Sequence, residues 1–512
     1  MAAHVPDNID EPLDIAPATA DRLRLVGLAL GVIALVAALI VSLVFGFGGL
    51  RRFMLSYLTG FVFVLTIALG ALFFVLLQHA TKAGWSVNVR RVPELMTRLF
   101  VPLAVLSLPI LLVTLFIPGE FKENAQTHEI ESLPTLYPWA GYAHHDEEHG
   151  GEGEGEYVDD YAPEVGQDPG VEGLQERVED GTPNVLEEEV VDGHILTENG
   201  ITIERARHHL HIDEITEKKT AYLNRPFFVA RVAIYFFAWW ALSQYFWRRS
   251  TEQDSTGEPR LTKEMTGRSY VGFLIYAITL TFAAFDLVMS LDPHFFSTIF
   301  GGYLFAGGVV SFFAATILAY QVLRMRGYLR QSVTVEHYHD LGKFLFAFVF
   351  FWGYIAFSQF MLIWYANIPE TTYWFGVRGA TSVPENMYLG DWPSDPAAPA
   401  GFGYWTIISM TLLFGHLLIP FAGLLSRHVK RNLTFLGFWA GWMLVMHYVD
   451  IYWLIMPEQL IGGWGLLPVV EVLCLIGFVA IAIGWVAGEA KVVKLRPVRD
   501  PRAVESLAFH NL

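Results

Sequence analysis

LVGLALGVIALVAALIVSLVFGFG, residues 25–48, contains no charged side chain. An α-helix rises about 1.5 Å per residue, so a run of this length can cross the roughly 30 Å hydrocarbon core of a bilayer. A helix is favoured there because it satisfies its own backbone hydrogen bonds, which an open sheet does not. The stretch therefore predicts a membrane-spanning helix.

Nine further apolar runs follow this first one, and together they predict an all-α polytopic membrane protein with ten transmembrane helices. The ten runs are 25–48, 54–78, 99–117, 226–247, 269–291, 297–323, 344–366, 402–425, 433–456 and 465–489.

Basic residues predict how these helices are oriented. The short connections after the second, fourth, sixth and eighth helices hold 4, 5, 4 and 3 Lys and Arg residues, whereas those after the first, fifth, seventh and ninth hold 2, 0, 1 and 0. Because cytoplasmic loops are enriched in Lys and Arg, both termini are expected in the cytoplasm. Segment 1–24 has no small-residue cleavage pattern, so the first helix is expected to remain as an anchor.

The chain is expected to divide into five parts, which alternate between polar and apolar segments. They are a cytoplasmic tail (1–24), helices one to three (25–117), a periplasmic loop (118–225), helices four to ten (226–489) and a cytoplasmic tail (490–512).

The periplasmic loop carries most of the chain's negative charge. Residues 146–192 hold 18 Asp and Glu residues against the single Arg177. This acidic composition, poor in large apolar residues, predicts a disordered insertion over 142–216. The insertion could be a solvated spacer, or a docking surface that steers a basic electron carrier.

A single cysteine, Cys474, limits the redox chemistry that the chain can support. Iron–sulfur clusters need several thiolates, and c-type haem needs a Cys-x-x-Cys-His motif. A b-type haem would need two axial histidines at one depth, whereas residue counting places His416 in the inner half of the eighth helix and His447 in the outer half of the ninth. We therefore expect no metal and no covalent cofactor on this chain, and we retain lipids and a quinone or quinol (menaquinone or ubiquinone) as candidate ligands.

Two aspartates stand at matching places in two helices that should run in the same direction. Asp286 is followed seven residues later by Pro293, and Asp450 is followed seven residues later by Pro457. Carboxylates are costly in hydrocarbon and usually face the protein interior. The match predicts an internal duplication into two four-helix bundles, helices two to five and six to nine, with helices one and ten flanking them.

Polar residues inside the expected spans fall into two groups by depth, and both are candidates for proton transfer. The outer group is Asp286, His447, Asp450, Glu471, Arg231 and Gln359. The inner group is His79, His339, Asp340, Lys343 and His416. Titratable groups at two depths, separated by an apolar middle, are what two aqueous half-channels require. Each residue alone could equally form a helix–helix hydrogen bond or a buried ion pair.

Three segments resemble a known family: DLVMSLDPHFFSTIFGGYLFAGG (286–308), DLGKFLFAFVFFWGYIAFSQFMLIWYANIPE (340–370) and HYVDIYWLIMPE (447–458). The chain resembles the NrfD or polysulfide-reductase type of integral membrane subunit, and it is most similar to the ActF-type subunit of bacterial alternative complex III, a quinol:cytochrome c oxidoreductase. The resemblance covers all ten expected helices and breaks between about 142 and 216.

The resemblance implies a multi-pass subunit of a respiratory-chain complex in the bacterial cytoplasmic (inner) membrane. It implies as partners a paralogous NrfD-type quinol-binding subunit, a periplasmic iron–sulfur subunit, multihaem and monohaem cytochrome c subunits, membrane lipids and, as an optional member, a terminal oxidase; nucleic acid is not implied. The redox centres would lie on those partners. This chain would contribute proton conduction or scaffold to quinol oxidation and electron transport.

Four residues near the expected outer face could instead meet a quinone: Asp292, His294, Trp364 and Tyr365. Asp292 and His294 fit equally well a polar turn before a helix, where an Asp caps the helix and Pro293 is tolerated. The two aromatic residues also fit a belt at the membrane interface.

Three functions remain open. The first is a proton-conducting or conformationally coupled subunit of a respiratory complex, and the second is a subunit of the same complex that binds quinol directly. The third is a secondary transporter, which internal repetition and carboxylates within the membrane would favour.

Overall fold

The computed structural model describes residues 11–44, 46–116, 121–123, 130–132, 136–140, 190–191, 194–195, 218–380, 404–457 and 468–510. The chain divides into a helical unit, Met1–Gly141 with Lys218–Leu512, and a second unit, Tyr142–Glu217. The acidic insertion expected over 142–216 lies outside the described residues, apart from two short paired strands, β3 (Val190–Val191) and β4 (His194–Ile195).

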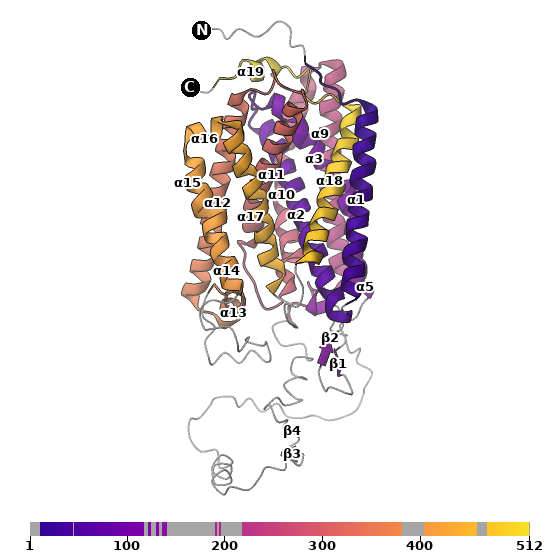
Figure 1. The fold of residues 1–512 in the computed structure, drawn as a ribbon, viewed down its shortest axis with the longest axis vertical. Coiled ribbons are helices and arrows are strands. Elements are labelled where there is room, and N and C mark those ends of the chain that lie inside the picture. Colours follow the sequence, from indigo (N-terminus) through magenta and orange to yellow (C-terminus); the bar gives the residue numbers. More distant parts are fainter. Residues whose placement is uncertain are drawn as a thin grey trace. The chain divides into compact units, whose positions relative to one another are not determined.

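Long apolar helices dominate the helical unit and lie alongside one another (Figure 1). Within the described residues, nine helical stretches are long and apolar enough to cross a membrane, which confirms a polytopic helical membrane protein. These stretches are Pro17–Leu43, Gly49–Ala80, Val87–Phe116, Arg225–Thr256, Pro259–Leu291, Phe300–Met325, Val335–Ala366, Tyr404–Leu425 and Val469–Val492.

The first part of the chain forms α1 (Pro17–Leu43), α2 (Gly46–Ala80), α9 (Arg225–Thr256) and α10 (Pro259–Leu287). The sequence explains two boundaries of α9. The Asn224 side chain accepts a hydrogen bond from the Phe227 N–H and caps the start, while Gly257 ends the helix with a left-handed φ of 71°. Both α9 and α10 extend beyond their apolar runs into the polar segment that joins them.

The third expected helix is divided into short pieces by proline. Residues 87–116 form η1 (Val87–Val89), α3 (Arg91–Thr97), α4 (Phe100–Leu106) and α5 (Leu108–Phe116). Pro102 and Pro109 lie in the first turns of α4 and α5, where the missing proline N–H breaks no helical hydrogen bond. The run therefore remains helical but is not one continuous helix.

The second part of the chain supplies the remaining helices. They are α11 (Phe300–Met325), α12 (Val335–Ala366), α13 (Pro369–Val377), α14 (Tyr404–Thr411), the π-helix η4 (Leu412–Leu418), α15 (Ile419–Leu425), α16 (Arg427–Arg431), α17 (Leu433–Ile455), α18 (Val469–Glu489) and α19 (Ala503–Leu507). The ninth expected span forms as α17, but its Trp, Tyr, His and Asp residues lower its hydropathy, and it is not among the nine described candidates.

Minor elements complete the described chain. They are the 3₁₀ turns η2 (Pro138–Ala140), η3 (Met289–Leu291) and η6 (Ala490–Val492), and an antiparallel pair of strands, β1 (Phe121–Glu123) and β2 (Ile130–Ser132).

Helices α2 and α11 form the centre of the helical unit. Helix α11 packs against α2, α12 and α17, and α2 also packs against α10 and α18. Helix α1 packs along α18, so two helices that are far apart in the sequence lie side by side (Figure 1). A Cβ atom added to Gly27 of α1 would lie 2.6 Å from the Gly484 Cα of α18, so only glycine permits this approach.

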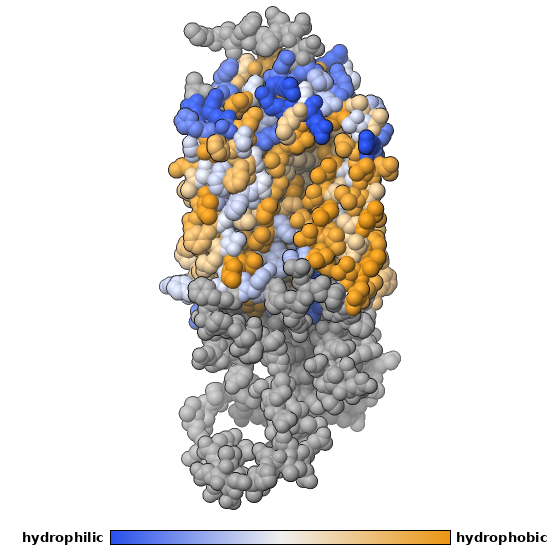
Figure 2. Space-filling view, in the orientation of Figure 1, coloured by the Kyte–Doolittle hydropathy of each residue, from blue (hydrophilic) through white to orange (hydrophobic). Residues whose placement is uncertain are grey.

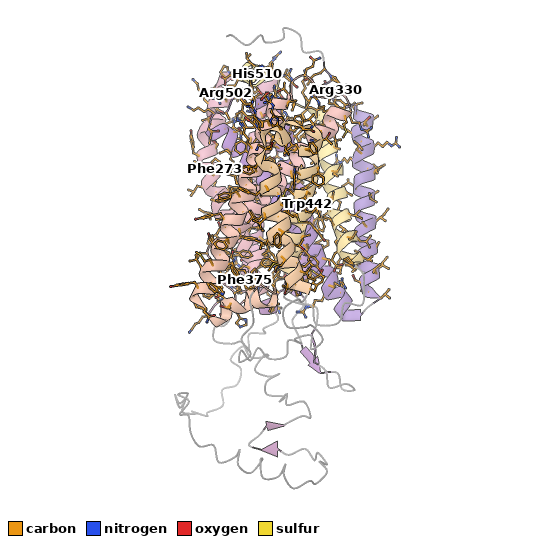
Figure 3. All side chains as sticks on the ribbon, turned by 60° about the vertical axis from the view of Figure 1, so that its left-hand side comes forward. Phe273, Arg330, Phe375, Trp442, Arg502 and His510 are labelled. Carbon is orange, nitrogen blue, oxygen red and sulfur yellow. The ribbon has the colours of Figure 1, made fainter. Side chains whose placement is uncertain are left out.

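The surface of the helical unit matches a membrane environment. Figure 2 shows apolar residues covering the helices along their length and hydrophilic residues gathered at one end. We call this end the basic end; it carries α16, and Figure 3 places Arg330 and Arg502 there, whereas Phe375 lies toward the opposite end.

Candidate proton-transfer site

Asp450 has a buried carboxyl group that accepts hydrogen bonds from two neutral donors. The Tyr303 hydroxyl of α11 donates to its Oδ1, and the Trp352 indole Nε1–H of α12 donates to its Oδ2 over 3.1 Å. Only 1% of the residue is exposed. Among the described residues no Lys or Arg lies within ion-pair distance of this carboxyl; its one candidate ionic partner is His447.

His447 lies one turn before Asp450 on α17, and a hydrogen bond orients its ring. The Nε2 atom lies 2.9 Å from the Thr66 Oγ1 of α2, and that hydroxyl donates its single proton to the Phe63 carbonyl, also over 2.9 Å. In that arrangement the hydroxyl accepts from His447, and the imidazole proton is assigned to Nε2. Consequently Nδ1 presents a lone pair toward Asp450 Oδ2, 3.9 Å away.

His416 contributes a second imidazole from the π-helix η4. In a regular α-helix the His416 carbonyl would face the nitrogen of Pro420, which has no N–H, so a wider π turn is favoured at this point. The His416 side chain is fully buried, and neither ring nitrogen has a hydrogen-bond partner among the described residues. Its ring centroid lies 3.9 Å from that of Trp352.

We call His416, His447 and Asp450 the His–His–Asp cluster. Each residue offers a nitrogen or oxygen atom, and these atoms all lie within 4.8 Å of one another. Residue counting predicted that His416 would lie toward the inner face, apart from His447, and this placement is wrong. His416 is near the midpoint of the Tyr404–Leu425 stretch, where the division into inner and outer halves has no meaning.

The chemistry of the His–His–Asp cluster suits the exchange of a proton. A buried polar group without a partner costs about 1–3 kcal/mol, so such groups in native proteins call for an explanation. Two lone-pair nitrogens beside a carboxyl provide several positions for one proton. A divalent metal would also match the spacing, but one carboxylate would leave a net positive charge in the lipid interior, which is costly.

Asp286 has a different environment from Asp450, although the sequence presents the two as a pair. Arg231 Nε donates to Asp286 Oδ2 over 2.9 Å and Arg231 Nη2 donates to Oδ1 over 2.8 Å, while the Tyr235 hydroxyl donates to Oδ2 over 2.7 Å. The Arg231 guanidinium also stacks 3.8 Å from the Tyr222 ring centroid. This carboxylate is neutralised by a cation and has no exposed surface.

Two other members of the predicted outer group lie apart from the His–His–Asp cluster. Glu471 accepts a hydrogen bond from Arg52 Nε over 2.7 Å, so it belongs to a partly buried ion pair that joins α18 to α2. Gln359 is buried on α12, and its Oε1 has no hydrogen-bond partner among the described residues.

The remaining inner residues lie near the basic end. His79, at the end of α2, stacks on Phe246 with a centroid distance of 5.3 Å, and its Nε2 has no partner in the described part of the chain. His339 is buried near the start of α12 with Nδ1 unpartnered, while Asp340 forms an ion pair with the half-exposed Lys343. No hydrogen bond among the described residues joins these side chains to the cluster.

The four candidate quinone-side residues occupy polar or exposed positions. Asp292 Oδ1 accepts hydrogen bonds from the backbone N–H groups of His294, over 2.9 Å, and Phe295, over 3.3 Å, so it stabilises the turn before α11. The His294 side chain is 42% exposed. Trp364 is 59% exposed and Tyr365 is 84% exposed at the end of α12, as in an interfacial belt.

The sequence analysis missed a buried ionic network at the basic end. Arg90 lies 2.9 Å from Glu94 and 2.8 Å from Asp500, while Arg91 contacts Glu94 at 3.0 Å and also pairs with Asp254. The spacing of Arg90, Arg91 and Glu94 on one helical turn was a detectable signal, but their distant partners on α9 and the C-terminal segment were not. Burial raises the pKa of the Asp500 carboxyl, but the Arg90 guanidinium together with the charge and the backbone N–H of Arg502 outweighs that effect, so the pKa is lowered.

In comparisons with known proteins, no family model matches the chain and no curated protein matches it in sequence.

Proposed function

We propose that this chain is a proton-conducting membrane subunit in which Asp450 exchanges the proton, and that it serves a respiratory complex which oxidises quinol and reduces cytochrome c. The observation that carries the proposal is the fully buried His–His–Asp cluster, with imidazole nitrogens that have no partner among the described residues. The similarity of its three quoted segments to NrfD-type and ActF-type subunits supports the assignment to a bacterial inner-membrane complex whose partners hold the iron–sulfur and haem centres.

The chemistry of Asp450 follows from the groups that face it. Tyr303, Trp352 and Thr66 contribute hydroxyl or N–H groups and no full charge, so the titratable neighbours are the two imidazoles and the Tyr303 phenol. The His447 Nδ1 lone pair would repel a bare carboxylate oxygen 3.9 Å away, whereas one shared proton would relieve that repulsion. The cluster therefore favours one bound proton that can pass between carboxyl and imidazole.

The proposal gives the two aspartates different roles. Asp450 is the exchanging group, whereas the Arg231–Asp286 ion pair is structural.

The proposal also includes a topology. The chain would cross the membrane ten times, with α17 as the ninth crossing and with two four-helix groups, and the basic end and both termini would lie in the cytoplasm. His79, His339 and Asp340 would then belong to the side from which protons enter.

Asp450→Asn tests the exchanging role. In the variant the amide oxygen can accept from the Trp352 N–H and the amide nitrogen can donate to the Tyr303 hydroxyl oxygen, but the side chain cannot exchange a proton. Electron transfer should therefore persist while the number of protons moved per electron falls. Gly441→Ala is the matched control on α17, because a Cβ there meets nothing within 4 Å. Proton movement by Asp450→Asn equal to that of the control, or stoichiometric metal in the purified protein, would overturn the proton role.

Purification tests the respiratory-complex assignment separately. The chain, extracted gently from native membranes, should co-purify with haem-bearing and iron-bearing polypeptides. Recovery of the chain alone, without iron or haem, would contradict the complex. It would favour the secondary transporter, for which the π-helical interruption of Tyr404–Leu425 beside the cluster is the supporting observation.

A further inference from the structure

No described residue forms a hydrogen bond that holds the His416 ring, so the position of the ring depends on the backbone that carries it. That backbone is a π-helix, a rare conformation that occurs mostly as short interruptions of α-helices and frequently at functional sites. Pro420 disfavours the α-helical alternative here, and a donor to a carbonyl that the π turn leaves unpaired would stabilise the turn further.

A side chain of α17 supplies the stabilising contact. The Trp442 indole Nε1–H donates to the Gly415 carbonyl over 2.7 Å. In a π-helix this carbonyl would pair with the N–H five residues on, which is residue 420, a proline without an N–H. The indole thus provides the donor that the backbone lacks.

Gly415 allows the two helices to approach closely enough for this bond. A Cβ atom at residue 415 would lie 2.6 Å from the Met446 Sδ of α17 and 3.6 Å from Trp442 Cζ2. Figure 3 places Trp442 midway along the helical unit, away from Arg502 at the basic end and from Phe375 at the other. This hydrogen bond therefore lies near the middle of the helices, and its acceptor, Gly415, directly precedes His416 in the sequence.

We propose that Trp442 is a positioning residue, whose indole N–H stabilises the π turn and thereby keeps His416 beside Trp352 and Asp450. The same helix α17 then carries two members of the His–His–Asp cluster and the residue that places the third. The inference rests on the proposed proton role only for its functional readout, because the backbone conformation can be measured independently.

The structural test is hydrogen–deuterium exchange of the full-length protein in nanodiscs, comparing Trp442→Phe with the wild type. Loss of one hydrogen bond should speed amide exchange within 412–418 about two- to tenfold. Trp485→Phe is the matched control, because its buried indole nitrogen has no partner among the described residues. Equal amide exchange rates within 412–418 in Trp442→Phe and in the control would overturn the inference, regardless of whether the His–His–Asp cluster transfers protons.

The functional test separates positioning from general stability. Trp442→Phe should change the pH profile of proton movement in the same direction as His416→Gln, and the double variant should match His416→Gln alone. Additive losses, or a reduced rate with an unchanged pH profile, would show that Trp442 does not act through His416. If Asp450→Asn leaves proton movement intact, the proton role fails, while the exchange result still decides the role of Trp442.

Discussion

Arg231 donates one hydrogen bond to each carboxylate oxygen of Asp286, so the two residues form a buried two-point ion pair between α9 and α10. Removing one partner of such a pair leaves an uncompensated charge. The sequence pairs Asp286 with Asp450, but this contact separates their roles.

Asp286→Asn is expected to lower the free energy of unfolding by about 3–5 kcal/mol, because Arg231 would keep its charge without a counter-ion. Thermal unfolding in detergent measures the effect. The double variant Arg231→Gln with Asp286→Asn should recover part of the loss, since neither charge then remains. A single variant as stable as the wild type would contradict the structural role.

Gly307→Ala is expected to disturb the His–His–Asp cluster without removing any of its groups. The added methyl would lie 3.0 Å from His447 Cε1 and 3.3 Å from Asp450 Oδ2, so both side chains must shift. Overpacking of this kind costs about 1–3 kcal/mol, and protons moved per electron should fall.

Gly302→Ala on the same helix is the control for this change, because its nearest neighbour would be the Ile299 Cγ1 at 3.9 Å. Proton measurements on reconstituted vesicles should separate the two alanine variants. Equal numbers of protons moved per electron in the two variants would mean that proton transfer does not depend on the exact positions of His447 and Asp450.

Acid is expected to release the C-terminal segment 493–510 from the basic end. Arg90 and Arg502 together outweigh the effect of burial and lower the pKa of Asp500 below its ordinary value of 3.8. The stabilisation is therefore fully present above that value and is lost as the pH falls through the lower, folded-state pKa. Limited proteolysis between pH 3 and pH 7 should detect the release only at the acidic end of this range.

Asp500→Asn provides the comparison, because it cannot form the ion pair at any pH. Its C-terminal segment should be cleaved faster at pH 7, and the acid-dependent step should shrink. A wild-type release centred near pH 6 would assign the effect to a different group.

Gly27→Val is expected to separate α1 from α18 and to lower the melting temperature, because even the Cβ would lie 2.6 Å from the Gly484 Cα. Gly267→Ala is a suitable reference, since a Cβ there meets nothing within 4 Å. A melting temperature unchanged by the valine would show that the glycine contact does not stabilise the helical unit.

Most long helices were predictable because uninterrupted apolar runs leave few alternatives in a membrane. Their ends were less predictable: α9 and α10 continue into polar sequence, where Asn224 and Gly257 and not hydropathy set the boundaries. The ninth expected span forms a helix, yet its aromatic and polar residues lower its hydropathy, so it is not among the nine candidate membrane spans in the described part of the chain. The count of ten crossings therefore stays a prediction.

The candidate site was only partly predictable. Asp450 and His447 were identified together because they lie one turn apart on one helix. His416 was assigned to the wrong group because counting residues does not reveal which helix faces which at the middle of a span. Pro420, four residues after His416, was the available signal of an irregular turn. Arg52 and Arg90 were seen as loop charges, since Glu471, the partner of Arg52, and Asp500, one of the two partners of Arg90, lie more than 400 residues away.

The close contact of α1 with α18 has a consequence for biosynthesis. Ribosomes release the first helix hundreds of residues before its glycine-rich face can meet the last one. During that interval a newly inserted α1 must be sheltered by lipid, by an insertase or by a temporary neighbour. Insertion of α18, and not of any helix between α2 and α17, is then the event that closes this side of the protein.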